Sequence, residues 1–185
     1  LALRARDRSG QGCHLDIAMT DAMFTFAWYA LALGAATGRF PGPGELPLAG
    51  GSPRYQLYPT SDGKIVACGA LEQKFWMAFT TAIGLPAEFV NDLRDPNATR
   101  AAVAKLIAAQ TSEHWRPIFA AADCCVTIVV PLEQAMRDPH FIGRGLFAHR
   151  IETGTGKTWP ALPLPIAPQF RPKLGAKKAP SLNKN

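Results

Sequence analysis

The clearest pattern of hydrophobic and polar positions lies in the middle of the chain. Two runs, Arg54–Thr60 and Lys64–Gly69, are predicted to be β-strands. The residues between them, Ser61-Asp62-Gly63, are typical of a hairpin turn. The pattern therefore predicts a β-hairpin at this place.

A helix is predicted directly after the hairpin. Phe75, Phe79 and Ile83 recur at helical spacing, and Glu72 stands where the segment begins. An acidic residue at a helix start offsets the positive end of the helix dipole, which is worth about 0.3–1 kcal/mol. Glu72 therefore has two open interpretations: a structural charge at a helix start, or a carboxylate in the wall of an active site.

The segments before the hairpin are predicted to be a strand and a buried helix. Cys13–Met19 alternates like a short strand. Thr20 or Asp21 is expected to cap the following helix, and Gly38 to end it. The apolar run Ala22–Ala36 has 15 residues, fewer than the ~20 that a membrane span needs. We therefore expect a buried helix and no membrane partner.

A proline- and glycine-rich segment, Arg39–Pro47, is predicted to be a linker and a domain boundary. The pair Gly50-Gly51 follows it. Glycine adopts backbone angles that other residues avoid, and it lets another group approach closely. The pair is therefore either a plain turn after the linker or part of a loop with a functional role.

The rest of the chain is predicted to be mostly helical, so the chain mixes helices and strands, as chains of the α/β and α+β fold classes do. Pro117 should kink its helix or delay its start. From Thr153 onward we expect an extended tail with one strand over 159–165, fraying beyond Ala176. The other predicted elements are helices over 86–93, 100–110 (capped by Asn97 or Thr99), 112–122 (opened by Thr111-Ser112) and 131–138, and a strand over 125–130.

Composition narrows the class of protein. The chain has 185 residues, 48% of them hydrophobic, which is enough for one folded domain or somewhat more. Its net charge is +6, and the excess of basic residues lies near the two ends. Such a charge would suit phosphate groups. No basic stripe interleaved with aromatic residues accompanies it, so solvated ends are expected and nucleic acid is not an expected partner.

The cysteines and histidines suggest neither disulfides nor a metal site. Four cysteines include no CxxC spacing, and the adjacent pair Cys124-Cys125 is a poor disulfide framework. Reduced thiols and a cytoplasmic location are therefore expected. Four histidines are scattered without metal-ligand spacing, so we expect no metal.

Five short motifs, taken in order, resemble the family III CoA-transferases, which include carnitine CoA-transferase and α-methylacyl-CoA racemase. The resemblance covers roughly residues 5–150. The motifs are Gly10-Gln11-Gly12 with Asp16 and Asp21, Gly50-Gly51-x-Pro53-x-Tyr55, Tyr58-x-Thr60-x-Asp62-Gly63, Gly69-Ala70-x-Glu72-x-x-Phe75, and Asp123-Cys124-Cys125-Val126-Thr127.

The resemblance implies the C-terminal part of a longer enzyme. Residues 1–46 would complete a large CoA-binding domain and its linker. Residues 47–150 would form a small α+β domain with the hairpin and several helices, and 151–185 a tail returning to the large domain. Members of the family are interlocked homodimers, so a homodimer is expected. The nucleophilic aspartate of the transferases would lie upstream of Leu1, so the chain alone should be inactive.

The resemblance also implies roles for individual residues. Glu72 matches the carboxylate that moves the α-proton in the racemases, and Gly50 and Gly51 match the loop that covers the acyl end of CoA. Tyr55 and Tyr58 point to opposite sides of a strand, so at most one of them faces the same pocket; Tyr55 is assigned to substrate binding. Arg54 departs from the racemase pattern, which has an apolar residue there. It would suit a carboxylated substrate or acceptor, or it is a surface arginine.

Three functions remain open. CoA transfer between a CoA thioester and a carboxylic acid is favoured by a narrow margin, because of Arg54 and because transferases predominate in the family. Racemisation of an α-methylacyl-CoA would use Glu72 as acid and base. The third is a non-catalytic assembly domain. In either reaction acyl-CoA is a substrate and no other cofactor is implied.

Overall fold

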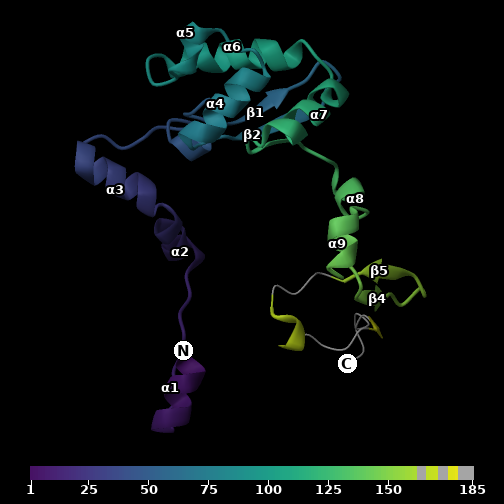
Figure 1. The fold of residues 1–185 in the computed structure, drawn as a ribbon. Helices are drawn as coiled ribbons and strands as arrows, with labels where there is room; N and C mark the ends of the chain where they lie inside the picture. The colour runs from purple at the N-terminus through teal and green to yellow at the C-terminus, as the bar shows by residue number, and fades with distance from the viewer. Residues whose placement is uncertain (162–165, 171–174, 179–185) are drawn as a thin grey trace. The chain divides into compact units, whose positions relative to one another are not determined.

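The computed structural model describes residues 1–161, 166–170 and 175–178. It divides into two compact units, Leu1–Ile128 and Val129–Asn185 (Figure 1). Within the described residues, no helix is long and apolar enough to cross a membrane. The domain boundaries predicted near residues 46 and 150 refer to a longer protein, and they stay a prediction.

A three-stranded antiparallel sheet is the centre of the first unit. Strand β1 (Tyr55–Pro59) pairs with β2 (Ile65–Gly69), and β2 pairs with β3 (Val126–Ile128). The amide of Thr60 donates to the carbonyl of Lys64, and Gly63 takes a φ of 71°, which closes the turn. The predicted hairpin is confirmed, and the strand predicted over 125–130 is shorter than expected.

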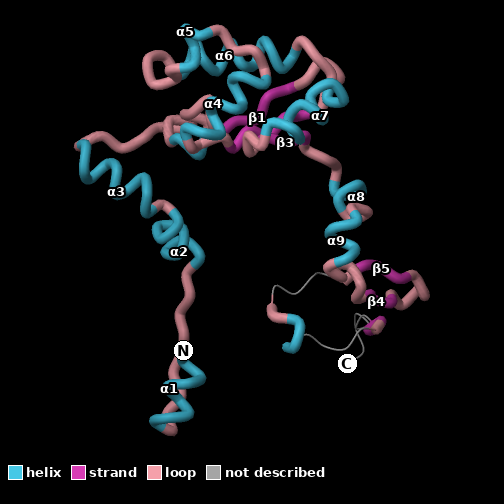
Figure 2. The backbone as a smooth tube through the Cα atoms, viewed as in Figure 1, coloured by secondary structure: helices cyan, strands magenta, loops and turns pink. Residues whose placement is uncertain are grey.

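Helices cover one face of this sheet (Figure 2). Helix α6 contacts β1, α7 contacts β3, and α4 contacts α7. The bounds are α4 Gln73–Ala82, α5 Ala87–Val90, α6 Pro96–Ala108 and α7 Ser112–Ala122. Mixed helices and a small sheet agree with the α+β class that the sequence predicts.

The covered face is buried because side chains alternate along each strand. Tyr58, Val66 and Ile128 point inward and are at most 5% exposed. On the opposite face Tyr55 and Leu57 are 43% and 61% exposed. The sheet therefore has one face in the core and one face open.

Four aromatic rings form the centre of the core under the sheet. Trp76, Phe79, Phe119 and Trp115 follow one another with ring centroids 5.9, 5.9 and 5.4 Å apart. Burial of such side chains stabilises a fold by about 1.5–3 kcal/mol each. Both indole nitrogens donate to backbone carbonyls, Trp76 Nε1 to Val90 at 2.7 Å and Trp115 Nε1 at 3.0 Å. No buried indole therefore carries the cost of an unpaired N–H.

The residues before the linker form three helices, α1 (Ala2–Ser9), α2 (Met19–Phe26) and α3 (Trp28–Thr37). The strand predicted over 13–19 is wrong: residues 11–18 have no regular structure, because no neighbouring strand in the described residues pairs with them. The single helix predicted up to Gly38 is divided at Ala27, although Gly38 does end α3 in a left-handed conformation. Most large apolar side chains of α2 and α3 are exposed.

Helix caps differ from some of the predictions. Thr20 and Asp21 do not cap α2, whose N-cap is Ala18. Asp95, rather than Asn97 or Thr99, caps α6 by accepting from the amide of Ala98. A carboxylate one residue before Pro96 was the missed signal, since proline suits the first helical position.

Helix α7 was predicted with the correct start. Thr111 caps it by accepting from the amide of His114. Pro117 lies inside the helix, so the delayed start that proline could have caused does not occur.

The second unit contains short elements. The helix predicted over 131–138 is in fact α8 (Leu132–Ala135), and Asp138 caps a new helix, α9 (Pro139–Gly143). Strand β4 (Arg150–Glu152) lies between β5 (Thr158–Pro160) and β6 (Ala176–Lys178) in a second small sheet. The expectation of an extended tail with one strand missed this pairing. Residues 162–165 and 179–185, where part of the predicted strand and the fraying lie, are outside the described residues.

The hairpin turn is tied to the start of α7 through Asp62. Its carboxylate accepts from the Thr60 hydroxyl at 2.5 Å, and from the amide and hydroxyl of Ser112 at 2.9 and 2.7 Å. These hydrogen bonds hold the pKa of Asp62 well below its ordinary value of 3.8. A turn residue thus joins two parts of the chain that are 50 positions apart.

We predict that Asp62→Asn lowers stability at neutral pH and flattens the acid side of the stability profile. The folded-state pKa of Asp62 is depressed, so its contribution is present above the unfolded pKa of about 4 and is lost as pH falls towards the folded value. The difference in urea-unfolding midpoint between variant and wild type should therefore stay constant from pH 7 to about pH 5 and begin to shrink below about pH 4. Asp16→Asn, in the irregular segment, is the control; equal loss in both variants would contradict the prediction.

Candidate active site

The glycine pair forms a constrained loop after the short 3-10 helix η1 (Pro47–Ala49). Gly50 has a φ of 106°, which disfavours any side chain. A Cβ at Gly51 would lie 2.3 Å from the carbonyl oxygen of Glu45. The close approach that the glycines permit is therefore an approach of the chain to its own backbone.

The carbonyl of Gly50 holds the loop to the rest of the unit. It accepts from Gln56 Nε2 at 2.8 Å and from Arg100 of α6 at 2.5 Å. The loop is thus tied to both β1 and α6.

A cavity of about 430 Å³ lies between this loop and the start of α4. Leu71 and Gln73, the residues on either side of Glu72, line the cavity together with Gly51 and Arg54. The remaining lining residues are Pro47, Ser52, Pro53, Asp92, Leu93 and Pro96. Of the five predicted site residues, Gly51 and Arg54 line this cavity. Glu72 lies between two lining residues but is not itself one of them, and Gly50 and Tyr55 do not line it either.

Glu72 is the N-cap residue of α4, with extended backbone angles of −73° and 145°. It is exposed, and its side chain makes no capping hydrogen bond. The carboxylate still lies at the positive end of the helix dipole, where a negative charge stabilises the helix. The carboxylate is therefore available for chemistry as well as for stabilising the helix.

Arg54 is not a solvated surface side chain. Its side chain is 15% exposed, and it donates from Nε and Nη2 to the two carboxylate oxygens of Asp92 at 2.9 and 2.6 Å. Its Nη1 donates to the carbonyl of Leu71 at 3.2 Å, and its guanidinium lies 5.2 Å from the Trp76 ring centre. The surface interpretation is wrong, and the positive charge beside the cavity is compensated by Asp92.

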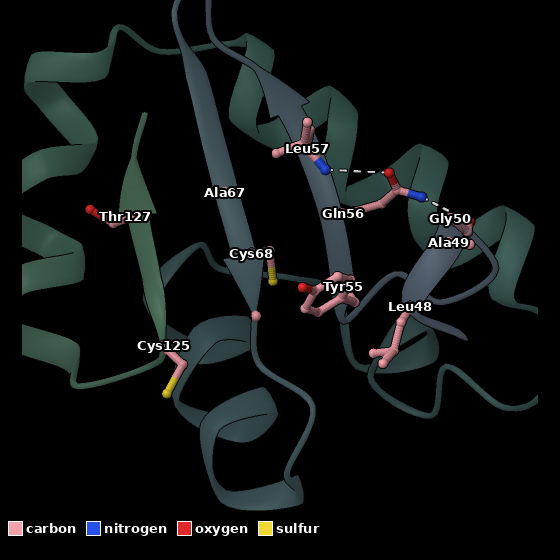
Figure 3. A pocket seen from close by; sticks show the side chains of 11 residues that line it. Leu48, Ala49, Gly50, Tyr55, Gln56, Leu57, Ala67, Cys68, Cys125 and Thr127 are labelled. Atoms are coloured by element: carbon pink, nitrogen blue, oxygen red, sulfur yellow. Dashed lines mark hydrogen bonds between the residues drawn. The ribbon is translucent and has the colours of Figure 1, made fainter. Parts of the chain in front are cut away.

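Tyr55 and Gly50 belong to a different hollow, on the open face of the sheet (Figure 3). This hollow has a volume of about 620 Å³. Tyr58, three residues on, is buried and donates to the carbonyl of Pro53 at 2.7 Å; burial raises its pKa. The alternation predicted for the two tyrosines is confirmed, and the structure separates Tyr55 from the cavity beside Glu72.

The adjacent cysteines have opposite environments. Cys124 is buried, whereas Cys125 is exposed in the sheet-face hollow and has a φ of 54°. Burial raises the pKa of the Cys68 thiol to about 12. All four cysteines are free, and the described part of the chain contains no cluster of three His, Cys, Asp or Glu residues that could hold a metal.

Asp92 is the residue that sequence reasoning missed. It lies just after α5 and is only 3% exposed. Its position 38 residues from Arg54 gave no local signal for the pair. The one available clue was Arg54 itself, because a cation in an otherwise apolar motif needs a partner if it is buried.

Comparison with known proteins agrees with the motifs. A family model described as CoA-transferase family III matches residues 1–185. α-Methylacyl-CoA racemase from Mus musculus is 30% identical to this chain, in an alignment that covers 100% of this chain and 48% of the racemase. The Homo sapiens racemase is 31% identical, and that alignment covers 80% of this chain and 39% of the racemase. Acetyl-CoA:oxalate CoA-transferase from Acetobacter aceti is 28% identical, in an alignment that covers 90% of this chain and 43% of the transferase.

Solved structures share the fold. A CAIB/BAIF family protein from Brucella suis has 25% identity and a TM-score of 0.58 over 98% of this chain and 48% of its own. Rv3272 from Mycobacterium tuberculosis has 19% identity and a TM-score of 0.60, and the match covers 90% of this chain and 43% of Rv3272. The chain spans about half the length of the curated relatives it matches. The predicted family resemblance and fold are confirmed.

We predict that Gly51→Ala destabilises the protein by about 1–3 kcal/mol, the usual effect of forcing an extra carbon into a packed place. The new methyl group would overlap the Glu45 carbonyl, which is backbone and cannot turn away. Thermal unfolding of variant and wild type measures the effect. Gly12→Ala, where a Cβ would meet nothing within 4 Å, should change stability far less. A Gly51 variant as stable as wild type would show that the loop is not packed as described.

Proposed function

We infer the function from the family to which this chain belongs, the CoA-transferase family III, whose model matches it over residues 1–185. Curated relatives include racemases and CoA-transferases that act on CoA thioesters. The chain is therefore part of an enzyme family of acyl-CoA chemistry. We propose that the full-length protein moves a proton at the carbon next to the thioester carbonyl, as a racemase, with Glu72 as acid and base.

The observation that carries this proposal is the place of Glu72. It is an exposed carboxylate at the start of α4, between two residues that line a cavity. The α-proton of a thioester is acidified by the carbonyl, so the Glu72 carboxylate can remove it and leave a planar enolate. The carboxyl group so formed, or a water molecule, returns a proton to the same carbon, and return to the opposite face inverts the centre. Positioned general bases contribute about 10²–10⁴-fold in rate.

The contacts of Arg54 weaken the sequence-based preference for CoA transfer. That preference relied on an uncompensated cation that would attract a carboxylic acid. Asp92 instead accepts hydrogen bonds from Nε and Nη2 of the guanidinium, so the pair carries no net charge towards the cavity. An α-methylacyl group, which is apolar, suits such a wall better than a second carboxylate does.

CoA transfer remains the second candidate, favoured by the similarity to acetyl-CoA:oxalate CoA-transferase over 90% of this chain. It would need the nucleophilic aspartate that the family resemblance implies outside this sequence.

A homodimer and a cytoplasmic location are part of this proposal. Exposed apolar side chains of α2 and α3, such as Met19, Phe26 and Trp28, support association with further protein surface.

We predict that, in the full-length protein, Glu72→Gln lowers α-proton exchange by about two to four orders of magnitude, because the amide keeps the shape and removes the base. The measurement is deuterium incorporation from heavy water at the α-carbon of a 2-methylacyl-CoA. CoA transfer to a free acid is assayed in parallel.

The control is Glu88→Gln, an exposed glutamate in the first turn of α5. Neither Glu88 nor its two sequence neighbours line the cavity, whereas both neighbours of Glu72 do. Glu88→Gln should leave exchange unchanged. Transfer without exchange in the wild type would contradict racemisation and support the second candidate.

We also predict that the 185-residue chain alone is inactive in both reactions and binds a dye specific for hydrophobic surface, because its exposed apolar helices lack a covering surface. Activity assays and fluorescence titration on the purified chain test this. Turnover that depends on Glu72 in the isolated chain would contradict it.

A further inference from the structure

We propose that Arg54 and Asp92 are positioning residues that restrain the backbone of Glu72 at the start of α4. The inference rests on the proposed role of Glu72, and it adds two residues that do not themselves react. Its basis is that Arg54 connects three separate segments of the chain at one point beside the cavity.

The first connection runs to the residue before Glu72. Arg54 Nη1 donates to the carbonyl oxygen of Leu71 at 3.2 Å. That carbonyl belongs to the peptide unit that leads into Glu72, so the bond restrains the backbone from which the carboxylate extends. The arginine itself follows directly after the glycine loop, and its amide donates to the Ser52 hydroxyl at 3.1 Å.

The second connection runs to the segment after α5. Asp92 accepts hydrogen bonds from both Nε and Nη2 of Arg54, and the Asp92 side chain is 4% exposed. Two charges this well covered are stable only as a pair, since either one alone would be buried without compensation. The pair therefore keeps the guanidinium in one orientation.

The third connection runs to α4 itself. The guanidinium lies over the ring of Trp76, one turn into the helix that Glu72 begins. Trp76 is fully buried and is fixed in turn by its bond to the Val90 carbonyl. Arg54 thus contacts the helix in its first turn and the peptide immediately before it, and a small displacement there would move the carboxylate.

Only arginine can make these contacts together. Its planar group presents several N–H donors in a fixed fork and stacks on aromatic faces, whereas lysine presents a single point charge. Arg54→Lys should keep the ion pair with Asp92 and lose the bond to Leu71. A displacement of about 1 Å in a catalytic group can reduce a rate by about 100-fold.

The test uses the full-length protein with three variants: Arg54→Lys, the double variant Arg54→Met with Asp92→Leu, and the control Arg116→Lys. The double variant removes both charges, so it stays informative if a single change prevents folding. Arg116 forms an exposed pair with Glu113 within α7. Each variant is assayed for α-deuterium exchange, thermal unfolding and amide hydrogen exchange by mass spectrometry.

In Arg54→Lys and in the double variant, we expect kcat for α-proton exchange to fall by about 10- to 100-fold with little change in KM. Amide exchange should become faster in peptides covering 50–54 and 69–74, and Arg116→Lys should match the wild type. A role confined to stability would lower the unfolding temperature and leave kcat of the folded enzyme unchanged. Unchanged kcat with unchanged amide exchange would also overturn the proposal.

The amide-exchange measurement separates this proposal from the proposed function. If the wild type shows no α-proton exchange, racemisation has failed, whereas faster amide exchange over 69–74 in Arg54→Lys would still support the restraint on Glu72. If amide exchange over these residues is unchanged in both variants, the restraint itself is absent.

Discussion

The burial of one face of the sheet β1-β2-β3 is the constraint on which the first unit depends. A two-stranded hairpin is marginally stable by itself. Here β3 adds a third strand, and the rings of Trp76, Phe79, Trp115 and Phe119 fill the space under the covered face. The glycine loop and the start of α4 leave this core at its edge. The cavity between them is therefore bounded on two sides by segments that are joined to the core.

Much of the family motif is explained by this architecture rather than by chemistry. Gly51 permits a close backbone contact, and Tyr58 donates to the backbone just before Arg54. Asp62 ties the turn to α7, and Gly63 closes the turn with a positive φ. Glu72 differs from them, because its side chain makes no capping bond and stays exposed. A motif residue without a structural bond is the better candidate for a chemical role.

The role inferred for Arg54 differs between the sequence and the structure. In sequence it is a cation within an apolar motif, which suggests an anionic substrate. In the fold, Asp92 neutralises it and Trp76 lies beneath it, so the same side chain becomes part of the wall. These contacts therefore give no support for a negatively charged substrate. They suggest instead that Arg54 affects the position of Glu72.

The sequence by itself determined some of the local elements and the family. The hairpin, the α4 start at Glu72 and the cap at Thr111 follow from neighbouring residues, because turn chemistry, capping and helical spacing act over a few positions. The strand predicted over 13–19 failed because a strand exists only with a partner, and the tail sheet was missed because β4 and β6 meet from distant positions. Only the tertiary structure decided that Tyr55 faces a different hollow from Glu72 and that Arg54 pairs with Asp92. These contacts join residues far apart in the chain, and burial rather than local pattern selects them.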